Sequence, residues 1–259
     1  MMLTAEILLM PFVAGLLVLA THLPLGLEVV RRGVVFMDLA IAQFAILGAI
    51  LIEMLLPNAS INWLLAASVV ASCMGVGLVL LVCQYATLYR EAMLGSIYVF
   101  TAAVVLILIS IDQGKAEHLT RMLTGDVLWI DSHSLLRLSI FTVLSWVLMG
   151  LFKRFKWQLG FYMAFALSVT YSVQLLGIYL VFATLIVPAL VSFATSSTQW
   201  AGITGIIGYA AGLFTALWLD WPAGACVVVL LVLSAMIITL LHSVVFKLSG
   251  TTRLKQPTS

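Results

Sequence analysis

Charged residues are scarce in this sequence. Lys, Arg, Asp and Glu make up 8% of its 259 residues, whereas a soluble domain carries about 25% charge. Hydrophobic residues account for 64%. So few charges cannot cover a surface that faces water, which excludes a soluble globular domain and favours a protein dissolved in lipid. The net charge of +2 is too small to indicate a nucleic-acid partner.

Motifs of enzymes are also absent. The sequence contains no Walker A, HExxH or GxSxG pattern. Its three cysteines, Cys73, Cys83 and Cys226, lie among apolar residues without a CxxC spacing and are typical of small core residues. We therefore expect a chain that is not an enzyme, binds no permanent cofactor and does not itself hydrolyse ATP.

Long apolar runs dominate what is present. A membrane span needs about 20 apolar residues, and clear candidates lie at 4–26, 34–56, 61–85, 92–111, 135–152, 200–219 and 222–246. A further block, 159–194, has no charge over 36 residues. As one helix it would be about 54 Å long, nearly twice the hydrocarbon thickness. Gly177 and Pro188 interrupt it, so we predict two passes with a turn near Gly177.

These runs predict an all-α, polytopic membrane protein of about nine passes, with a single transmembrane domain over 1–259. Of the 12 basic residues, nine fall on one side of the nine-pass arrangement and three, Lys115, Arg121 and Arg137, on the other. The excess of basic residues marks the cytoplasmic side. The N-terminus is therefore predicted outside and the C-terminus inside.

Asp38 is a carboxylate inside an apolar run, RRGVVFMDLAIAQFAILGA. Asp38, Ala42, Ala45 and Ala49 share one helix face because their spacing is 4, 3 and 4. Small residues let another helix come close, so Asp38 is predicted to point into the bundle. Gln43 lies on a different face, and we expect its amide to bridge to a neighbouring helix.

Two interpretations of Asp38 remain open. A buried carboxylate within a membrane is a candidate functional site, here for a transported cation. Alternatively, Asp38 pairs with Arg31, Arg32 or a backbone donor near the membrane boundary. Glu28 is expected to form a local ion pair with the same arginines.

Other polar residues lie at the predicted membrane surfaces. The outer segment IDQGKAEHLTRMLTGDVLWIDSHS contains His118 and His133 with several carboxylates, a mixture that attracts divalent cations. Its spacings match no closed ligand set, so an ordinary solvated loop is the competing interpretation. On the inner side, Arg90 and Glu91 form either a surface for a partner protein or a membrane boundary.

Five segments in a shared order resemble the permease subunits of bacterial ABC importers for zinc, manganese or iron. They are GIYLVFATLIVPA (177–189), GDVLWI (125–130), YREAMLG (89–95), WPAGACVV (221–228) and LGLEVVRRG (25–33). The resemblance implies a multi-pass protein of the bacterial cytoplasmic membrane that transports a divalent metal ion. It also implies a second copy of the chain, a separate cytoplasmic ATPase subunit and an extracytoplasmic metal-binding protein as partners.

The sequence departs from that family at its metal pair. The second pass of the family carries an Asp followed four residues later by a His, and the two are taken to line the metal path. Four residues after Asp38 the chain has Ala42. If the comparison is anchored on Gly48 instead, Leu39 takes the place of the aspartate and Gln43 takes the place of the histidine. An amide is a poorer zinc ligand than an imidazole.

A second departure concerns the ATPase. The family has a cytoplasmic segment of roughly 20 residues after the fifth pass, with a helix that docks into the ATPase, whereas KRFKWQLGFY leads almost directly into the next pass. Contact with an ATPase must then use residues 89–94, which include Arg90 and Glu91, or the basic residues Lys153, Arg154 and Lys156; otherwise it is lost. Two rival functions follow: a stand-alone secondary carrier of a small solute, and a membrane assembly subunit that transports nothing.

Overall fold

The fold is a bundle of long helices. The computed structural model describes residues 2–56, 59–85, 90–111, 127–155 and 158–253. Those ranges contain nine α-helices, one 3₁₀ turn and no strand, which confirms the all-α prediction. The helices are α1 (Met2–Arg32), α2 (Phe36–Leu55), α3 (Ile61–Tyr85), α4 (Arg90–Ile111), α6 (Ser132–Phe155), α7 (Gln158–Leu176), α8 (Ile178–Thr195), α9 (Thr198–Leu219) and α10 (Ala223–Arg253), and the turn is η2 (Val127–Trp129).

Eight of the described helices are long and apolar enough to cross a membrane. The exception is α7, whose apolar part, Gly160–Leu176, is shorter. At 1.5 Å per residue this part is about 26 Å long, a little less than the hydrocarbon core of about 30 Å. Other helices cover it, since Phe161, Phe165, Val169 and Val173 are all fully buried. A helix surrounded by protein has no need to match the lipid thickness.

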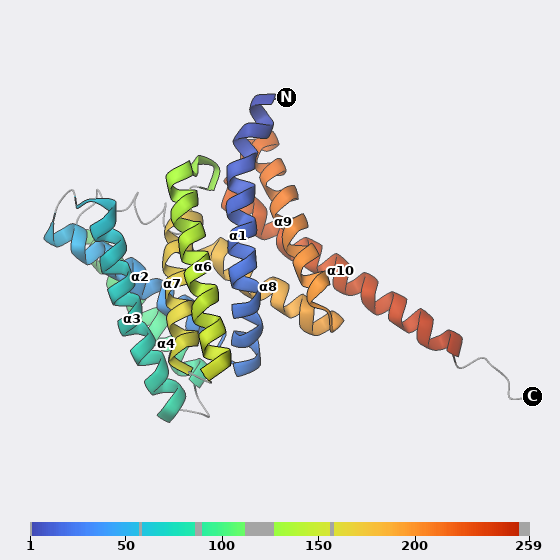
Figure 1. Ribbon diagram of the computed structural model, residues 1–259, viewed down its shortest axis with the longest axis horizontal. Helices are drawn as coiled ribbons and strands as arrows, with labels where there is room; N and C mark the ends of the chain where they lie inside the picture. The colour runs from blue at the N-terminus through green and yellow to red at the C-terminus, as the bar shows by residue number, and fades with distance from the viewer. Residues whose placement is uncertain (1, 57–58, 86–89, 112–126, 156–157, 254–259) are drawn as a thin grey trace, which may run out of the picture.

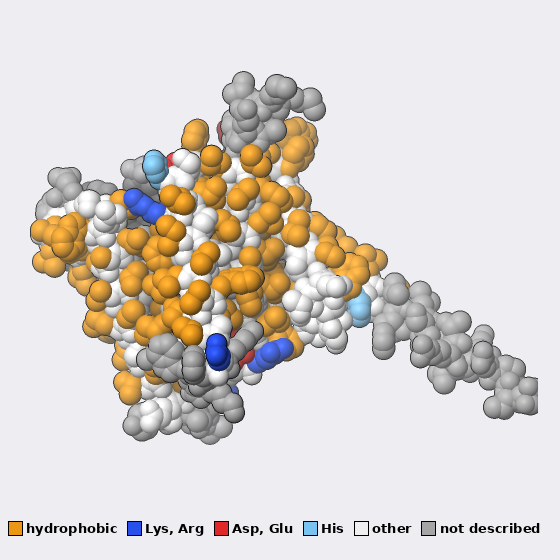
Figure 2. All heavy atoms as spheres, viewed as in Figure 1, with side chains coloured by type: hydrophobic (Ala, Val, Ile, Leu, Met, Phe, Trp, Pro, Cys, Tyr) orange, Lys and Arg blue, Asp and Glu red, His pale blue; other side chains and the backbone are white. Residues whose placement is uncertain are grey.

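The helices form two groups with three helices between them (Figure 1). α2 packs on α3 and α4, and α9 packs on α10 and α8. Between these groups, α1 contacts α6, α8 and α9, while α7 contacts α6, α3 and α2. Large apolar side chains cover much of the outer surface, with few charged ones among them (Figure 2). The surface therefore suits lipid; which end of the chain faces the cytoplasm stays a prediction.

Close helix contacts depend on small residues. A Cβ atom at Gly48 in α2 would lie 2.5 Å from the carbonyl oxygen of Ala67 and 2.6 Å from the Cβ of Ala71, both in α3. A Cβ at Gly212 in α9 would likewise collide with the backbone of Val227 in α10. Such contacts let helices approach through van der Waals packing, which drives helix association in lipid.

A single residue, Gly177, joins α7 to α8, as the sequence predicted. Its N–H donates to the carbonyl of Val173 at 2.9 Å, and its own carbonyl accepts from the N–H of Val181 at 3.2 Å. Gly177 thus closes one helix and opens the next. Pro188 does not end a helix: it lies inside α8, which continues to Thr195. Proline is tolerated within membrane helices because neighbouring groups satisfy the freed backbone.

We expect Gly177→Ala to lower the thermal unfolding temperature. Gly177 has φ 82° and ψ 156°, a backbone region essentially restricted to glycine, where another residue costs about 1–3 kcal/mol. Gly150→Ala is the control, because a Cβ at Gly150 has no neighbour within 4 Å in the described part of the chain and alanine favours the helix by roughly 0.5–1 kcal/mol. Unfolding of the purified proteins in detergent measures both; equal unfolding temperatures for the two variants would contradict this account of the joint.

Candidate functional site

Asp38 lies in the first turn of α2 and is 1% exposed. Ala42, Ala45 and Ala49, which share its face, are also buried, so the predicted inward orientation is confirmed. The Asp38 Oδ1 atom has no hydrogen-bond partner among the described residues. A buried carboxylate oxygen left without a partner is unfavourable by at least about 1–3 kcal/mol. A cation is the kind of ligand that would satisfy it.

Gln43 is also buried, although it lies on a different face from Asp38. Both faces are covered because α2 packs on α3, α4, α7 and α8. Helix α2 is therefore contacted by other helices on several sides. The expected bridge from the Gln43 amide to another helix stays a prediction.

The Glu91 carboxylate caps the start of α2 from a different helix. Its Oε1 atom accepts from the Val35 N–H at 2.6 Å, and its Oε2 atom accepts from the Phe36 N–H at 3.3 Å. The first N–H groups of a helix have no partner within the helix, and its positive end favours an anion. Beside it, Nη2 of Arg90 lies 3.7 Å from the place of a Cβ at Gly33. Arg90 and Glu91 thus both adjoin the turn between α1 and α2.

His22 is a second buried polar side chain, to which the sequence had assigned no role. Its Nδ1 atom lies 3.0 Å from the carbonyl oxygen of Val18 and 3.0 Å from Oγ1 of Thr21. A carbonyl only accepts, so Nδ1 carries a hydrogen, and in the neutral imidazole Nε2 then presents a lone pair. Nε2 has no partner among the described residues. The only signal in the sequence was one histidine within the apolar run 4–26.

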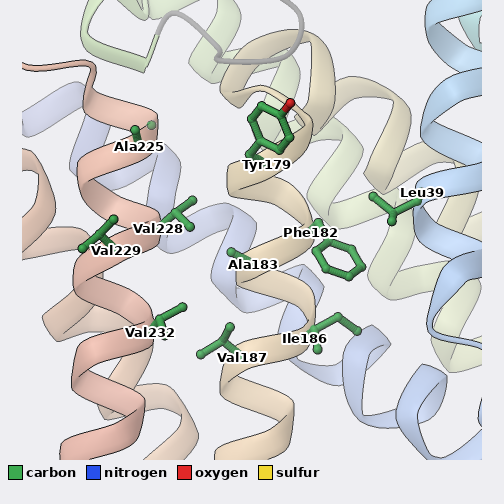
Figure 3. Close-up of a pocket in the computed structure, with 11 residues that line it drawn as sticks. Leu39, Tyr179, Phe182, Ala183, Ile186, Val187, Ala225, Val228, Val229 and Val232 are labelled. Carbon is green, nitrogen blue, oxygen red and sulfur yellow. The ribbon is translucent and has the colours of Figure 1, made fainter. Parts of the chain in front are cut away.

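An apolar groove of about 470 Å³ lies between α2, α8 and α10. Figure 3 shows Leu39 reaching from α2 towards Phe182, with Tyr179 at one end and Val228 and Val232 across the groove on α10. Among the described residues no charged side chain lines it, and Asp38, although adjacent to Leu39 in the chain, is not one of its lining residues. A divalent cation that entered the groove would lose its bound water molecules and find no ligand to replace them. The groove is therefore not a favourable site for such a cation. The groove suits an apolar surface.

The predicted outer site is described only in part. His133 is exposed in the first turn of α6, and His118 lies outside the described residues. Asp131 accepts a hydrogen bond from the Ser134 N–H at 3.1 Å, and hydrogen bonds from Ser134 lower the pKa of that carboxyl. Asp131 therefore caps α6. No group of three His, Cys, Asp or Glu residues that could hold a metal ion is found in the described ranges.

The predicted inner surface is also described in part. Arg154 is exposed in the last turn of α6, whereas Lys156 and the side chain of Lys153 lie outside the described residues. Only residues 156 and 157 separate α6 from α7. The connection is as short as the sequence predicted and leaves no room for a docking helix.

Arg32 ties the C-terminal end of α1 to these two helices. Its Nε atom bonds to Oε1 of Glu28 at 2.8 Å, which confirms the predicted local ion pair. Its guanidinium carbon also lies 4.4 Å from the ring centroid of Phe161, 5.4 Å from that of Phe152 and 5.7 Å from that of Tyr162. A cation over aromatic faces is stabilising, so these contacts hold α1, α6 and α7 together at one end.

Comparison with known proteins gave one family and a common fold. The sequence profile of the ABC 3 transport family matches residues 4–157 and 155–242. Among curated proteins, no sequence matches significantly. The structure of PsaBC from Streptococcus pneumoniae in complex with Fab has a similar fold, with a TM-score of 0.65, 20% identity, and coverage of 91% of this chain and 89% of that one. A structure described as an inward-facing metal-chelate type ABC transporter is also similar, with a TM-score of 0.54, 15% identity, and coverage of 93% and 78%.

Proposed function

We propose, from the premise that this chain belongs to the ABC 3 transport family, that it is the membrane-spanning permease of an ABC importer for a divalent metal ion. The match over nearly the whole chain carries this proposal, and the eight apolar helices agree with it. Zinc is the expected cargo, with manganese and iron as the close alternatives. The family makes the chain a transport subunit rather than a catalytic one.

The proposed assembly has three further components. A cytoplasmic ATPase supplies the energy, since the chain has no nucleotide-binding motif. An extracytoplasmic metal-binding protein delivers the ion, and a second copy of the permease completes the path. The proposed location is the bacterial cytoplasmic membrane, with the N-terminus outside. Arg90, Lys153, Arg154 and Lys156 are the proposed contacts for the ATPase.

Asp38 is the proposed ion-binding residue on the path. Support comes from its burial, from its position in the first turn of α2, and from the oxygen that has no partner in the described part of the chain. A carboxylate suits zinc, manganese and iron alike. Because one carboxylate is an incomplete ligand set, the other ligands must come from water or from other residues.

Metal uptake into cells that lack this chain tests the proposal. We expect uptake of zinc, manganese or iron to fall, to return when the chain is restored, and to stop when ATP is depleted. Affinity purification of the restored chain should recover an ATPase subunit. Cells that take up all three metals normally without the chain would instead support an assembly subunit that transports nothing.

A secondary carrier of a small solute is the second candidate. The two-residue separation of α6 and α7 leaves no docking helix, and the apolar groove would suit an organic solute. In the same cells, uptake that survives ATP depletion but stops when the proton gradient collapses would favour this candidate.

A further inference from the structure

We propose that Glu91 is a positioning residue for transport: it holds the start of α2 to α4 and thereby sets the place of Asp38. This inference rests on the proposed function, in which Asp38 binds the ion. It differs from the expectation drawn from the sequence, where Glu91 was either a contact for a partner protein or part of a membrane boundary.

The contact itself is the first step. Val35, the residue before α2, provides no side-chain cap of its own. Glu91 supplies the cap with both carboxylate oxygens, at 2.6 Å from the Val35 nitrogen and 3.3 Å from the Phe36 nitrogen. Hydrogen bonds from backbone N–H groups to a carboxylate are stronger than neutral ones and have defined geometry. The start of α2 is therefore held at one point on α4.

The second step is the short distance to Asp38. Asp38 comes three residues after Val35, about 4.5 Å along the helix axis. A helix is stiff over one turn, so a displacement of its first residues moves Asp38 by a similar amount. A misplacement of about 1 Å can reduce the rate of a process that depends on geometry by about 100-fold. The position of the ion ligand thus depends on the cap.

The third step is that the closest approaches between α2 and its other neighbour, α3, are made by apolar groups. Phe44 lies against Gly75, and Gly48 lies against Ala67 and Ala71. Dispersion forces in these contacts are not directional, so they add no bond of defined geometry at the start of α2. The two hydrogen bonds to Glu91 add such a constraint and tie the start of α2 to α4. Glu91 is also the second residue of α4, at the end where the ATPase is proposed to act, so movement of that end would reach Asp38 through the cap.

Glu91→Ala and Glu91→Gln test this role, with Glu28→Gln as the matched control. Glu28 is likewise a partly buried carboxylate with a 2.8 Å bond, but its partner Arg32 belongs to the same helix. We expect Glu91→Ala to lower maximal metal uptake per folded molecule about tenfold or more. Glu91→Gln should retain part of it, because the amide oxygen still accepts one bond. Glu28→Gln should transport like the unchanged chain.

A double-mutant cycle shows whether Glu91 acts through Asp38. We expect Glu91→Ala to have little further effect on uptake once Asp38→Asn is present, since residues that act as one unit are not additive. Independent effects that multiply would overturn the proposal. It would also be overturned by unchanged uptake in Glu91→Ala, or by loss of the ATPase subunit on purification, which would make Glu91 a partner contact. If Glu91→Ala does not fold, the same criteria apply to Glu91→Gln.

Hydrogen exchange provides a readout that does not depend on transport. The amides of residues 35–38 should exchange faster in Glu91→Ala than in the unchanged chain, and no faster in Glu28→Gln. Equal exchange in all three proteins would overturn the positioning role. If the unchanged chain transports no metal while Glu91→Ala still accelerates exchange, the proposed function is wrong. The capping role of Glu91 at the start of α2 would still hold.

Discussion

Asp38→Asn abolishes most metal uptake while leaving the protein folded; this is the expected result with the largest effect on function. Asparagine has nearly the same shape as aspartate. It therefore fits the buried position of Asp38, where α2 packs against neighbouring helices. It lacks the negative charge that a divalent cation requires. Loss of a residue that supports a metal site only indirectly lowers metal affinity or activity about 10–100-fold. Loss of a direct ligand should lower it at least as much. Without a charge to bury, the unfolding temperature should stay the same or rise.

Initial rates of metal uptake, normalised to folded protein in the membrane, measure this effect. Asp220→Asn is the control, because Asp220 lies in the exposed turn between α9 and α10 with φ 54°. Asparagine adopts that left-handed conformation readily, so the control should transport normally. Equal uptake by Asp38→Asn and the unchanged chain would remove Asp38 from the ion path and leave it a structural residue.

Gly48→Leu should prevent stable folding, the largest expected effect on stability. Its Cβ alone would lie 2.5 Å from the Ala67 carbonyl oxygen and 2.6 Å from the Ala71 Cβ, so α2 and α3 would have to separate. Overpacking of a tight contact typically costs about 1–3 kcal/mol, and the rest of a leucine side chain adds to that. Because α2 also carries Asp38, separation of the two helices would disturb the candidate ion site as well.

Gly77→Leu is the matched control for that substitution. Gly77 lies in α3, the helix that Gly48 contacts, but a Cβ there has no neighbour within 4 Å among the residues that the structure describes. Leucine on this open face would meet lipid and would strengthen the helix by roughly 1 kcal/mol relative to glycine. The yield of monodisperse protein in detergent, together with its unfolding temperature, compares the two variants. Similar yields and temperatures would show that α2 and α3 can move apart easily.

Features that depend on nearby residues could be predicted from the sequence. The division of the uncharged block at Gly177, the buried face of Asp38, the Glu28–Arg32 pair and the short link between α6 and α7 all follow from hydropathy, helical spacing or chain length. Pro188 is the instructive exception. Its ring disfavours a helix locally, yet it is buried inside α8, where packing decides the conformation.

Features that join distant segments could not be predicted. The Val35 N–H and its acceptor Glu91 are 56 residues apart, and nothing in either segment identifies the other. Arg32 could be placed at a membrane boundary, but its aromatic neighbours belong to α6 and α7, more than 100 residues later. Hydropathy reports which residues face lipid. It carries no information about which two helices meet, so long-range caps and cation–aromatic contacts appear only in three dimensions.

The one-residue joint between α7 and α8 also limits how the protein can move. A connection made of Gly177 alone contains two soft torsion angles, since peptide bonds are planar. Two torsions allow α8 to swing about a fixed point at the end of α7, but they do not allow it to slide along α7 or to draw away from it. A gating motion that shifts α8 must therefore pivot at this end or carry α7 with it. In a pivot, the largest displacement is at Thr195, the end of α8 farthest from Gly177.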